Sequence, residues 1–394
     1  MESKVKRMRR FLEGTLTASA LCAIFACSGN TNTTGPAPPL PTGQTGSLNL
    51  YTTTKAGCYV SDTVACVTPP ALGTAAVTAL GTEYVSSSAS YLLVGDHAGN
   101  VTAWKTNGTT APTTPISCGT STGLTPITGM AAYLGTTTYV YFVSGTTLYV
   151  NSSTNTTPCS TTTAATIPTS LPSGTVGLVL SGNTIYGITK SRQYFSVTGG
   201  STTLLSNNQS LPNNVPSTAS IGGVTADHNG IVFVTDYANS AIYAFYADNT
   251  TGTLTGINGN LSGVADISNP SAIATFYASN PSQSYCTTGP CEFLDVVNYS
   301  GAVAQFVLSV NGTGASTSIG YNEFNAPYTQ CEIINPTAMT SFPDATLPGI
   351  LNTSSAGVPY VYLGQNGTST GPCFDVSSGT TFGNGVTAYT PVGE

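Results

Sequence analysis

Residues 231–245, IVFVTDYANSAIYAF, contain two apolar stretches separated by a short polar turn. β-Branched and aromatic side chains fill both stretches, whereas Asp, Asn and Ser fill the turn. This pattern is typical of two antiparallel strands joined by a hairpin. The preceding residues 223–227, GVTAD, form a third candidate strand of smaller residues. The sequence therefore predicts a unit of three successive strands, the first of which is built from small side chains.

The three-strand unit recurs along the chain. Pairs of second and third strands are predicted at 91–104, 139–150, 184–197, 231–245 and 293–306. First strands of small and apolar residues are predicted around residues 77, 130, 178, 224, 273 and 339. Most of these first strands are roughly 50 residues apart, close to the length of a four-stranded propeller blade. Such regular repetition favours an array of blades over a sandwich.

The two ends of the chain would complete a ring. Residues 385–389, GVTAY, nearly repeat residues 223–227, so we expect them to be a seventh first strand. Residues 48–60, LNLYTTTKAGCYV, look like a second-and-third pair without a first strand before it. Together they would form one blade, and closure of the ring removes exposed sheet edges. We therefore predict an all-β, seven-bladed β-propeller closed by strands from both termini, with six blades as the alternative.

Residues 231–257 resemble a blade of the lactonase-like and NHL-like seven-bladed propellers. In those blades an apolar strand ends in Asp or Asn, a turn follows, and the outer strand leads to a TG-x-L motif. Here that motif is Thr251-Gly252-Thr253-Leu254, and residues 294–314 repeat the pattern more loosely. The resemblance implies the propeller fold and leaves the activity open, because propellers host many functions.

The N-terminus predicts export. Basic residues precede an apolar run over residues 14–26, which is the pattern of a signal peptide and too short to span a bilayer. The run ends in Ile24-Phe25-Ala26-Cys27, which resembles the bacterial lipobox. We therefore expect residues 1–26 to be a lipoprotein signal peptide and Cys27 to be the lipidated N-terminus. Ser28 implies sorting to the outer membrane, and cleavage of an ordinary signal peptide nearby is the alternative.

Residues 27–46 predict a tether. They are rich in Pro, Thr, Gly and Asn and carry almost no large apolar side chain, so they cannot bury enough surface to fold. The tether would separate the anchor from a propeller domain over residues 47–394.

The chain has few charged side chains with which to bind a partner. Charged residues make up 6% of the chain, where a soluble domain carries roughly a quarter. Beyond the signal peptide, the basic residues are Lys55, Lys105, Lys190 and Arg192. Nucleic-acid binding is excluded because no basic patch can replace phosphate counterions. Contact with the membrane should come through the anchor, and an envelope protein or a glycan is the expected partner.

The propeller domain contains eight cysteines, and an even number of cysteines in an exported chain predicts disulfides. A metal site is not expected, because no pair of these cysteines has CxxC spacing. They are Cys58, Cys66, Cys118, Cys159, Cys286, Cys291, Cys331 and Cys373. Cys118 and Cys159, like Cys331 and Cys373, lie about one blade period apart. Each of these pairs could tie neighbouring blades. Cys58 with Cys66 and Cys286 with Cys291 could close small loops, but the connectivity stays open.

The turns between second and third strands lie on one face of a propeller. We predict a candidate ligand face there, formed by Lys55, Asp96, His97, Lys190, Arg192 and Asp236. The alternative interpretation is that exposed turns tolerate charge and that Asp caps them through its own side chain. His228 follows a first strand and should lie on the opposite face from His97, which argues against a two-histidine metal site.

Two classes of function follow. We expect a non-catalytic binding or scaffolding lipoprotein of the cell envelope, facing the periplasm or the outside, with no cofactor, no metal and no assigned catalytic residue. The alternative is a lactonase-like hydrolase that uses the same face, which would need a base and a cation that converge on one substrate.

Overall fold

The computed structural model divides the chain into two units, residues 1–36 and 37–394, and all described residues belong to the second. The predicted signal peptide, Cys27, the tether and Lys55 lie outside the described residues. Among the described residues, no helix has the length and apolarity needed to cross a membrane. The structure describes residues 48–52, 57–59, 77–86, 89–105, 116–118, 126–153, 159, 165–167, 169–278, 291–329, 336–341, 352–353, 358–359, 361–365 and 385–389.

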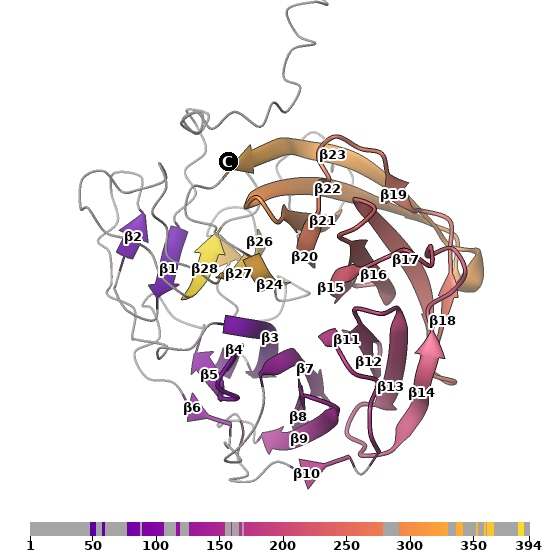
Figure 1. Cartoon of the computed structure of the whole chain (residues 1–394). Helices are drawn as coiled ribbons and strands as arrows, with labels where there is room; N and C mark the ends of the chain where they lie inside the picture. Colours follow the sequence, from indigo (N-terminus) through magenta and orange to yellow (C-terminus); the bar gives the residue numbers. More distant parts are fainter. Residues whose placement is uncertain are drawn as a thin grey trace, which may run out of the picture. The chain divides into compact units, whose positions relative to one another are not determined.

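Residues 77–210 form three antiparallel four-stranded sheets (Figure 1). Blade 1 consists of β3 (Val77–Ser86), β4 (Ala89–Asp96), β5 (Val101–Lys105) and β6 (Ile116–Ser117). Blade 2 consists of β7 (Ile127–Leu134), β8 (Thr138–Ser144), β9 (Thr147–Ser153) and β10 (Ala165–Thr166). Blade 3 consists of β11 (Thr175–Ser181), β12 (Thr184–Thr189), β13 (Gln193–Thr198) and β14 (Leu204–Ser210).

Two further blades follow the same order. Blade 4 consists of β15 (Ile221–Ala226), β16 (Ile231–Asp236), β17 (Ala241–Asp248) and β18 (Thr253–Gly256), with the short β19 (Leu261–Ser262) also paired to β17. Blade 5 consists of β20 (Pro270–Ala278), β21 (Cys291–Asn298), β22 (Ala302–Asn311) and β23 (Ser318–Thr329), with a 3-10 turn, η1 (Gly314–Ser316), between the last two. The predicted first strands and strand pairs are therefore confirmed in these five blades.

The sixth sheet contains both terminal strands. Its members are β24 (Pro336–Ser341), β27 (Val361–Gln365), β28 (Gly385–Tyr389), β1 (Leu48–Thr52) and β2 (Gly57–Tyr59), in that order across the sheet. A separate two-stranded pair is formed by β25 (Asn352–Thr353) and β26 (Val358–Pro359).

The predicted pairing of the two termini is confirmed, because Asn49 of β1 lies opposite Ala388 of β28. The seventh blade is not confirmed. On its other side β28 pairs with β27, with Leu363 opposite Thr387, so residues 385–389 are the third strand of the sixth blade and not the first strand of another. The hairpin of β1 and β2 is correspondingly an outer pair.

The innermost strands of these blades form a closed ring (Figure 1). Successive contacts join β3 to β7, β11, β15, β20 and β24, and β24 returns to β3. Two hydroxyl groups fasten the last blade to the first: Thr337 Oγ1 donates to the Val77 carbonyl at 2.8 Å, and Thr82 Oγ1 donates to the Ser341 carbonyl at 3.1 Å. The described strands therefore form a closed β-propeller of five four-stranded blades and one further sheet that combines strands from both termini.

Small residues are required where the innermost strands meet. Each first strand has a register irregularity near its start, and a small residue lies in or directly after it: Ala79, Gly129, Gly177, Gly223, Ala272 and Ala338. A Cβ at Gly129 would lie 2.9 Å from the carbonyl carbon of Gly177, and one at Gly223 would lie 2.8 Å from the Cα of Ala272. Because these contacts are to backbone, a larger side chain would push neighbouring blades apart.

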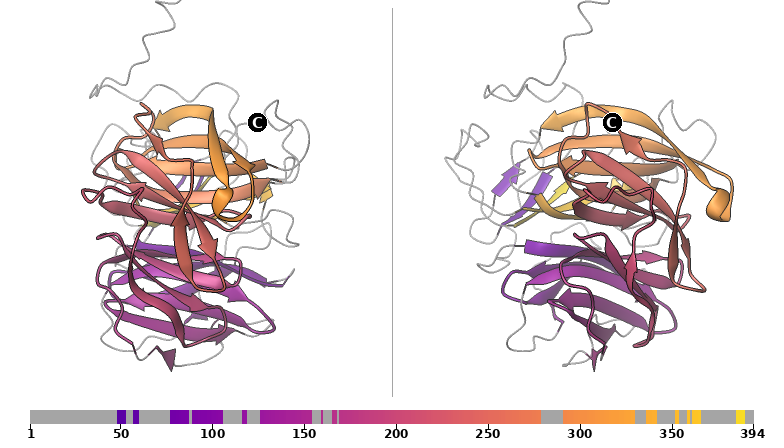
Figure 2. Two further views of the ribbon diagram at one scale, coloured as in Figure 1. Left: turned by 90° about the vertical axis from the view of Figure 1, so that its right-hand side faces the viewer. Right: turned by 45° about the vertical axis from the view of Figure 1, so that its right-hand side comes forward.

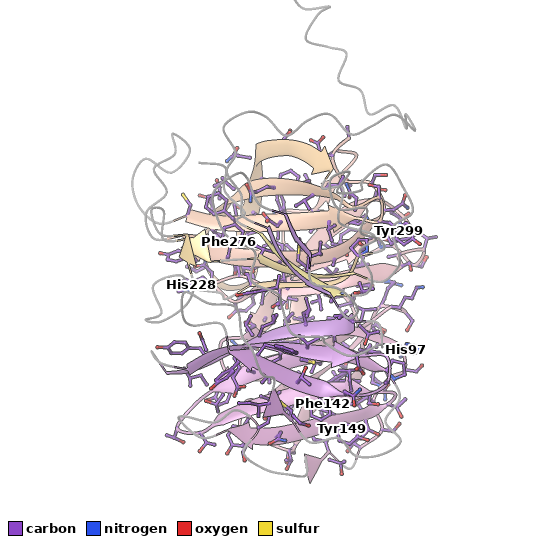
Figure 3. The ribbon with its side chains drawn as sticks, turned by 90° about the vertical axis from the view of Figure 1, so that its left-hand side faces the viewer. His97, Phe142, Tyr149, His228, Phe276 and Tyr299 are labelled. Carbon is purple, nitrogen blue, oxygen red and sulfur yellow. A yellow bond between two sulfur atoms is a disulfide. The ribbon has the colours of Figure 1, made fainter. Side chains whose placement is uncertain are left out.

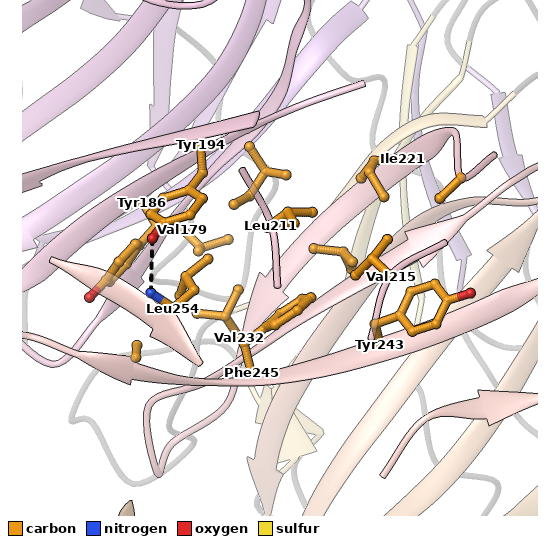
Figure 4. Close-up of a cluster of buried hydrophobic side chains, with 14 of the residues drawn as sticks. Val179, Tyr186, Tyr194, Leu211, Val215, Ile221, Val232, Tyr243, Phe245 and Leu254 are labelled. Carbon is orange, nitrogen blue, oxygen red and sulfur yellow. Dashed lines mark hydrogen bonds between the residues drawn. The ribbon is translucent and has the colours of Figure 1, made fainter. Parts of the chain in front are cut away.

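Adjacent blades pack face to face through apolar clusters. Between blades 3 and 4, Tyr186 and Tyr194 meet Val232, Phe245 and Leu254, all buried (Figure 4). The backbone N–H of Leu254 donates to the Tyr194 hydroxyl at 3.2 Å. The TG-x-L motif therefore works as a packing anchor, with its leucine inserted between two blades. Figure 2 shows the sheets of the described residues, one packed next to another, in two further views.

One predicted disulfide is confirmed. Cys118, directly after β6 of blade 1, bonds to Cys159, which lies between β9 and β10 of blade 2. It joins the outer edges of neighbouring blades, as the spacing of one blade period predicts. Cys291 is also disulfide-bonded. Its predicted partner Cys286 lies outside the described residues, as do Cys66, Cys331, Cys373 and the side chain of Cys58.

Removing residues 385–394 should strongly destabilise the protein, because it takes away the strand between β27 and β1 and leaves the N-terminal strands β1 and β2 without their partner in the sheet. We expect a melting temperature lower by at least roughly 10 °C. The matched control removes only residues 390–394 and keeps β28 intact, so it should melt within a few degrees of the wild type. Thermal unfolding followed by circular dichroism measures both, and an unchanged melting temperature after the longer deletion would contradict the terminal closure.

Candidate functional site

The predicted ligand face is formed by the hairpins between the second and third strands. In blades 1 to 5, the last residue of the second strand pairs with the first residue of the first strand. We call these residues the cap positions: Asp96, Ser144, Thr189, Asp236 and Asn298. All five are buried. The repeat thus places a small polar side chain at the same point of each hairpin.

Asp236 is a fully buried cap, with 0% of its surface exposed. Its Oδ1 accepts hydrogen bonds from the backbone N–H groups of Ser220, Ala238 and Asn239 at 3.0, 3.0 and 3.2 Å. Its Oδ2 accepts from Asn239 Nδ2 at 2.6 Å and from the Tyr243 hydroxyl at 3.5 Å. The carboxylate therefore holds its own hairpin and the segment that enters blade 4.

Asp96 plays the same role in blade 1. Its carboxylate accepts from the backbone N–H and the side-chain amide of Asn100, at 2.8 and 2.7 Å. In blade 3, Thr189 Oγ1 accepts from the backbone N–H of Gln193 at 2.9 Å. In blade 5, Asn298 Oδ1 accepts from the backbone N–H of Ser268 at 3.0 Å. These bonds support the turn-capping interpretation of both aspartates.

The cationic candidates are placed differently. His97 and Lys190 are exposed on hairpins of blades 1 and 3. Arg192 is half-buried and donates from Nη2 to the Val215 carbonyl at 2.8 Å, in the segment between blades 3 and 4. None of the hydrogen bonds described above joins two of the candidate residues.

The charges of Asp236 and Arg192 nevertheless both affect the pKa of one neighbour, Tyr243. Burial and, to a smaller extent, the charge of Asp236 and its hydrogen bond raise the pKa of Tyr243 to about 12, and the charge of Arg192 opposes this rise. The structure thus brings Arg192 and Asp236 near one buried phenol at the junction of blades 3 and 4. Asp96 and His97 belong to blade 1, outside this group.

Two tyrosines on this face were not singled out by the sequence analysis. Tyr237 and Tyr299 directly follow the cap positions of blades 4 and 5 and are 36% and 52% exposed. Their rings meet edge to face, with centroids 5.8 Å apart and planes at 88°. The signal was available, because Asp-Tyr and Asn-Tyr occupy the same position in successive repeats. It was missed because only charged and histidine residues were weighed in these turns.

The opposite face carries a second polar group. His228, in the hairpin between β15 and β16, stacks on Tyr277 with ring centroids 4.6 Å apart, and its backbone N–H donates to Glu292 Oε1 at 3.0 Å. His97 and His228 lie on opposite faces, as predicted, and Tyr299 lies on the side of His97 (Figure 3). Within the described residues, no group of three or more His, Cys, Asp or Glu side chains could hold a metal ion.

Asp227, at the end of β15 next to His228, is a buried cap of that second face. Burial raises its pKa to about 6, although hydrogen bonds from the backbone N–H of Ile231 and from Asn229 lower it. Ionisation of this carboxyl group therefore lowers the stability of the folded protein.

A central channel of about 310 Å³ runs between the innermost strands. Its described lining is apolar or hydroxyl-bearing, with no Asp, Glu, His, Lys or Arg side chain. The hydroxyl groups bind across blades: Ser341 Oγ donates to the Thr275 carbonyl and Thr275 Oγ1 donates to the Ala226 carbonyl, both at 2.6 Å. The hydroxyl groups of the channel wall therefore form hydrogen bonds that join neighbouring blades.

Comparisons with known proteins give only distant structural likenesses. The chain is similar to a protein from Lactobacillus plantarum, with 18% identity over 88% of this chain and 99% of that one and a TM-score of 0.46. It is also similar to a streptogramin B lyase, with 12% identity, coverage of 88% and 97%, and a TM-score of 0.46. A Bacteroides thetaiotaomicron protein of unknown function gives 11% identity, coverage of 88% and 76%, and a TM-score of 0.43. No protein-family model and no curated protein matches the sequence. Likenesses this distant assign no activity, and the propeller assignment rests on the sheets themselves.

Replacing Asp227 with Asn should stabilise the protein at neutral pH. A carboxyl whose folded pKa is raised loses stability as the pH rises from the unfolded pKa near 3.8 to the folded pKa of about 6, and the loss persists above that range. The neutral amide avoids this cost, with an upper bound of about 3 kcal/mol.

The measurement is the difference in unfolding free energy between variant and wild type, from urea titrations at pH 4, 5, 6 and 7. The difference should grow across this range. The matched control is Asp248→Asn in the same blade, whose exposed carboxylate has its pKa lowered by hydrogen bonds from Thr250 and Thr251, so its replacement should not stabilise. A pH-independent effect of Asp227→Asn would refute the assignment.

Proposed function

We propose that the protein is an exported, lipid-anchored β-propeller of the bacterial cell envelope that binds a partner and catalyses no reaction on it. The observation that carries this proposal is the bonding of Asp236. Its two oxygens accept hydrogen bonds from three backbone N–H groups and from the Asn239 amide, and the side chain is fully buried. A carboxylate engaged in this way is poorly suited to accept a proton from a substrate.

The exposed groups of the same face support recognition. His97 belongs to blade 1, Lys190 to blade 3, Tyr237 to blade 4 and Tyr299 to blade 5, and all four side chains are exposed. Groups distributed over several blades suit an extended partner that is contacted at many points. A small substrate would need its catalytic groups within hydrogen-bonding reach of each other.

The proposed export and lipid anchoring rest on the sequence. Ile24–Cys27 matches the lipobox pattern, Cys27 would carry the lipid, and residues 27–46 would act as the tether. Ser28 favours the outer membrane over the inner one. We take the partner to be a glycan or another protein of the envelope, and the face of the propeller between second and third strands to be the surface that meets it.

A lactonase-like hydrolase is the second candidate, and one observation favours it. Arg192 and Asp236 both act electrostatically on Tyr243, so a cation, a carboxylate and a phenol gather at one junction between blades. This function would require Asp236 to give up its hydrogen bonds to backbone before it could act as a base.

Site-specific cross-linking in living cells tests the binding face. A photoreactive residue replaces His97 on the proposed face or, as the matched control, the exposed His228 on the opposite face. We expect covalent adducts with an envelope component from position 97 and few from position 228. In the same cells, Cys27→Ser should move the protein from the membrane fraction to the soluble fraction, since the lipid is lost.

Hydrolysis is measured on the purified protein with γ- and δ-lactones in a pH-stat. We expect no turnover above the uncatalysed rate. Turnover that is abolished by Asp236→Asn in a protein that is still folded would overturn the proposal in favour of the hydrolase. Equal adducts from both faces would also overturn it, as would membrane retention of the Cys27→Ser variant.

A further inference from the structure

We infer that Tyr237 and Tyr299 form a stacking site for a neutral, β-linked, gluco-configured oligosaccharide. This inference rests on the proposed function and names the ligand class and the site on the same face. The two rings are the large aromatic groups most exposed among the described residues. Exposed tyrosines are costly to leave in water and are typical of interfaces, where a rigid ring supplies contact area at little entropic cost.

The backbone beneath the two rings is fixed by one residue, Asn269. Its side-chain amide donates to the Tyr237 carbonyl at 2.9 Å, and its own carbonyl accepts from the backbone N–H of Tyr299 at 3.0 Å. Asn269 is in turn held by Ser240, whose Oγ accepts from its backbone N–H at 3.1 Å. The hairpins of blades 4 and 5 are therefore clamped to the segment between them. Such preorganisation lowers the entropy that binding would otherwise cost.

The edge-to-face contact also orients the rings. With the planes at 88° and the centroids 5.8 Å apart, the edge of one ring meets the other, so the two form a corner. Tyr299, the more exposed of the two, keeps a ring surface available to solvent. A flat ligand could lie on this ring while its rim meets polar groups of the adjoining turns.

The surroundings of the rings are polar and mostly neutral. Asn239, Ser268, Asn269 and Ser300 are exposed in the same hairpins and in the segment that joins them. The cap carboxylate of Asp236 is buried and already hydrogen-bonded, so a ligand cannot contact it directly. Hydroxyl and amide groups both donate and accept hydrogen bonds, which matches a ligand rich in hydroxyl groups.

A β-linked gluco-configured sugar fits this combination. Its hydroxyl groups are equatorial, so both faces of the pyranose ring present C–H groups that can pack on an aromatic ring. Its rim presents hydroxyl and acetamido groups to the neighbouring amides and hydroxyls. Anionic glycans fit less well, because the chain has a net charge of −7 and no described Lys or Arg follows the cap positions of blades 4 and 5.

Calorimetric titration of the purified protein with chitotetraose and cellotetraose tests the inference. We expect Tyr299→Ala to weaken binding at least about tenfold, as is usual for loss of an aromatic anchor. Tyr299→Phe keeps the ring and should stay within about threefold of the wild type. The matched control is Tyr277→Ala, which removes an aromatic ring of the opposite face and should leave affinity unchanged. Melting temperatures of the three variants separate loss of the site from loss of the fold.

Three results would overturn the inference. The first is unchanged affinity of Tyr299→Ala, and the second is the absence of any heat with both sugars. The third is Tyr299-dependent binding of a peptide with the sequence PAPPLP, residues 36–41, in place of the sugars. If cross-links from position 97 persist in any of these cases, the binding function stands and only the glycan assignment fails.

Discussion

The close approach of the six innermost strands is the constraint on which the structure depends. Backbone meets backbone where Gly129 faces Gly177 and where Gly223 faces Ala272, so even a methyl group at Gly129 or Gly223 would lie closer than 3.0 Å to a backbone atom. The first strands are consequently rich in Gly, Ala, Ser and Thr, whereas most of the largest fully buried side chains belong to the second and third strands and fill the space between blades. The hydroxyl groups of the first strands then bond across the joints, since few other polar partners reach the centre.

The same repeat fixes the candidate site. In blades 1 to 5 each second strand ends in a buried polar cap. The caps of blades 1, 3 and 4 bind the backbone of their own hairpins, and Asn298 of blade 5 binds the segment that enters its blade. The residue after the cap is exposed in blades 1, 3, 4 and 5. Structural and functional positions are thus adjacent in the sequence. Asp236 holds the turn, and the next residue, Tyr237, is exposed, where we propose that a partner binds. The local rule explains why the carboxylates that stand out in the sequence are poor candidates for chemistry, and why their neighbours are better candidates for binding.

Much of the fold could be predicted from periodicity. The alternation of small first strands with apolar hairpins located five blades, and one blade period between Cys118 and Cys159 located a disulfide. Residues 385–389 show where such reasoning fails. Their sequence nearly copies a first strand, but pairing with β27 and β1 makes them a third strand. Strand position is decided by which neighbours the chain reaches, and local composition does not encode that. For the candidate site, the solvent exposure of the side chains was more informative than their charge, and the exposure of Tyr299 is seen only in the structure.

The most direct test of this account compares two glycine replacements. Gly129→Ala places a methyl group 2.9 Å from the backbone of the next innermost strand, whereas the methyl group of Gly320→Ala in the outer strand β23 would lie 3.6 Å from Ser309 Cβ, an ordinary contact. Urea unfolding of the purified proteins measures both. We expect Gly129→Ala to lower the unfolding free energy by about 1–3 kcal/mol, through overpacking, and Gly320→Ala to leave it unchanged or raise it by up to about 1 kcal/mol. Equal stability of the two variants would contradict the claim that close approach of the innermost strands governs the fold.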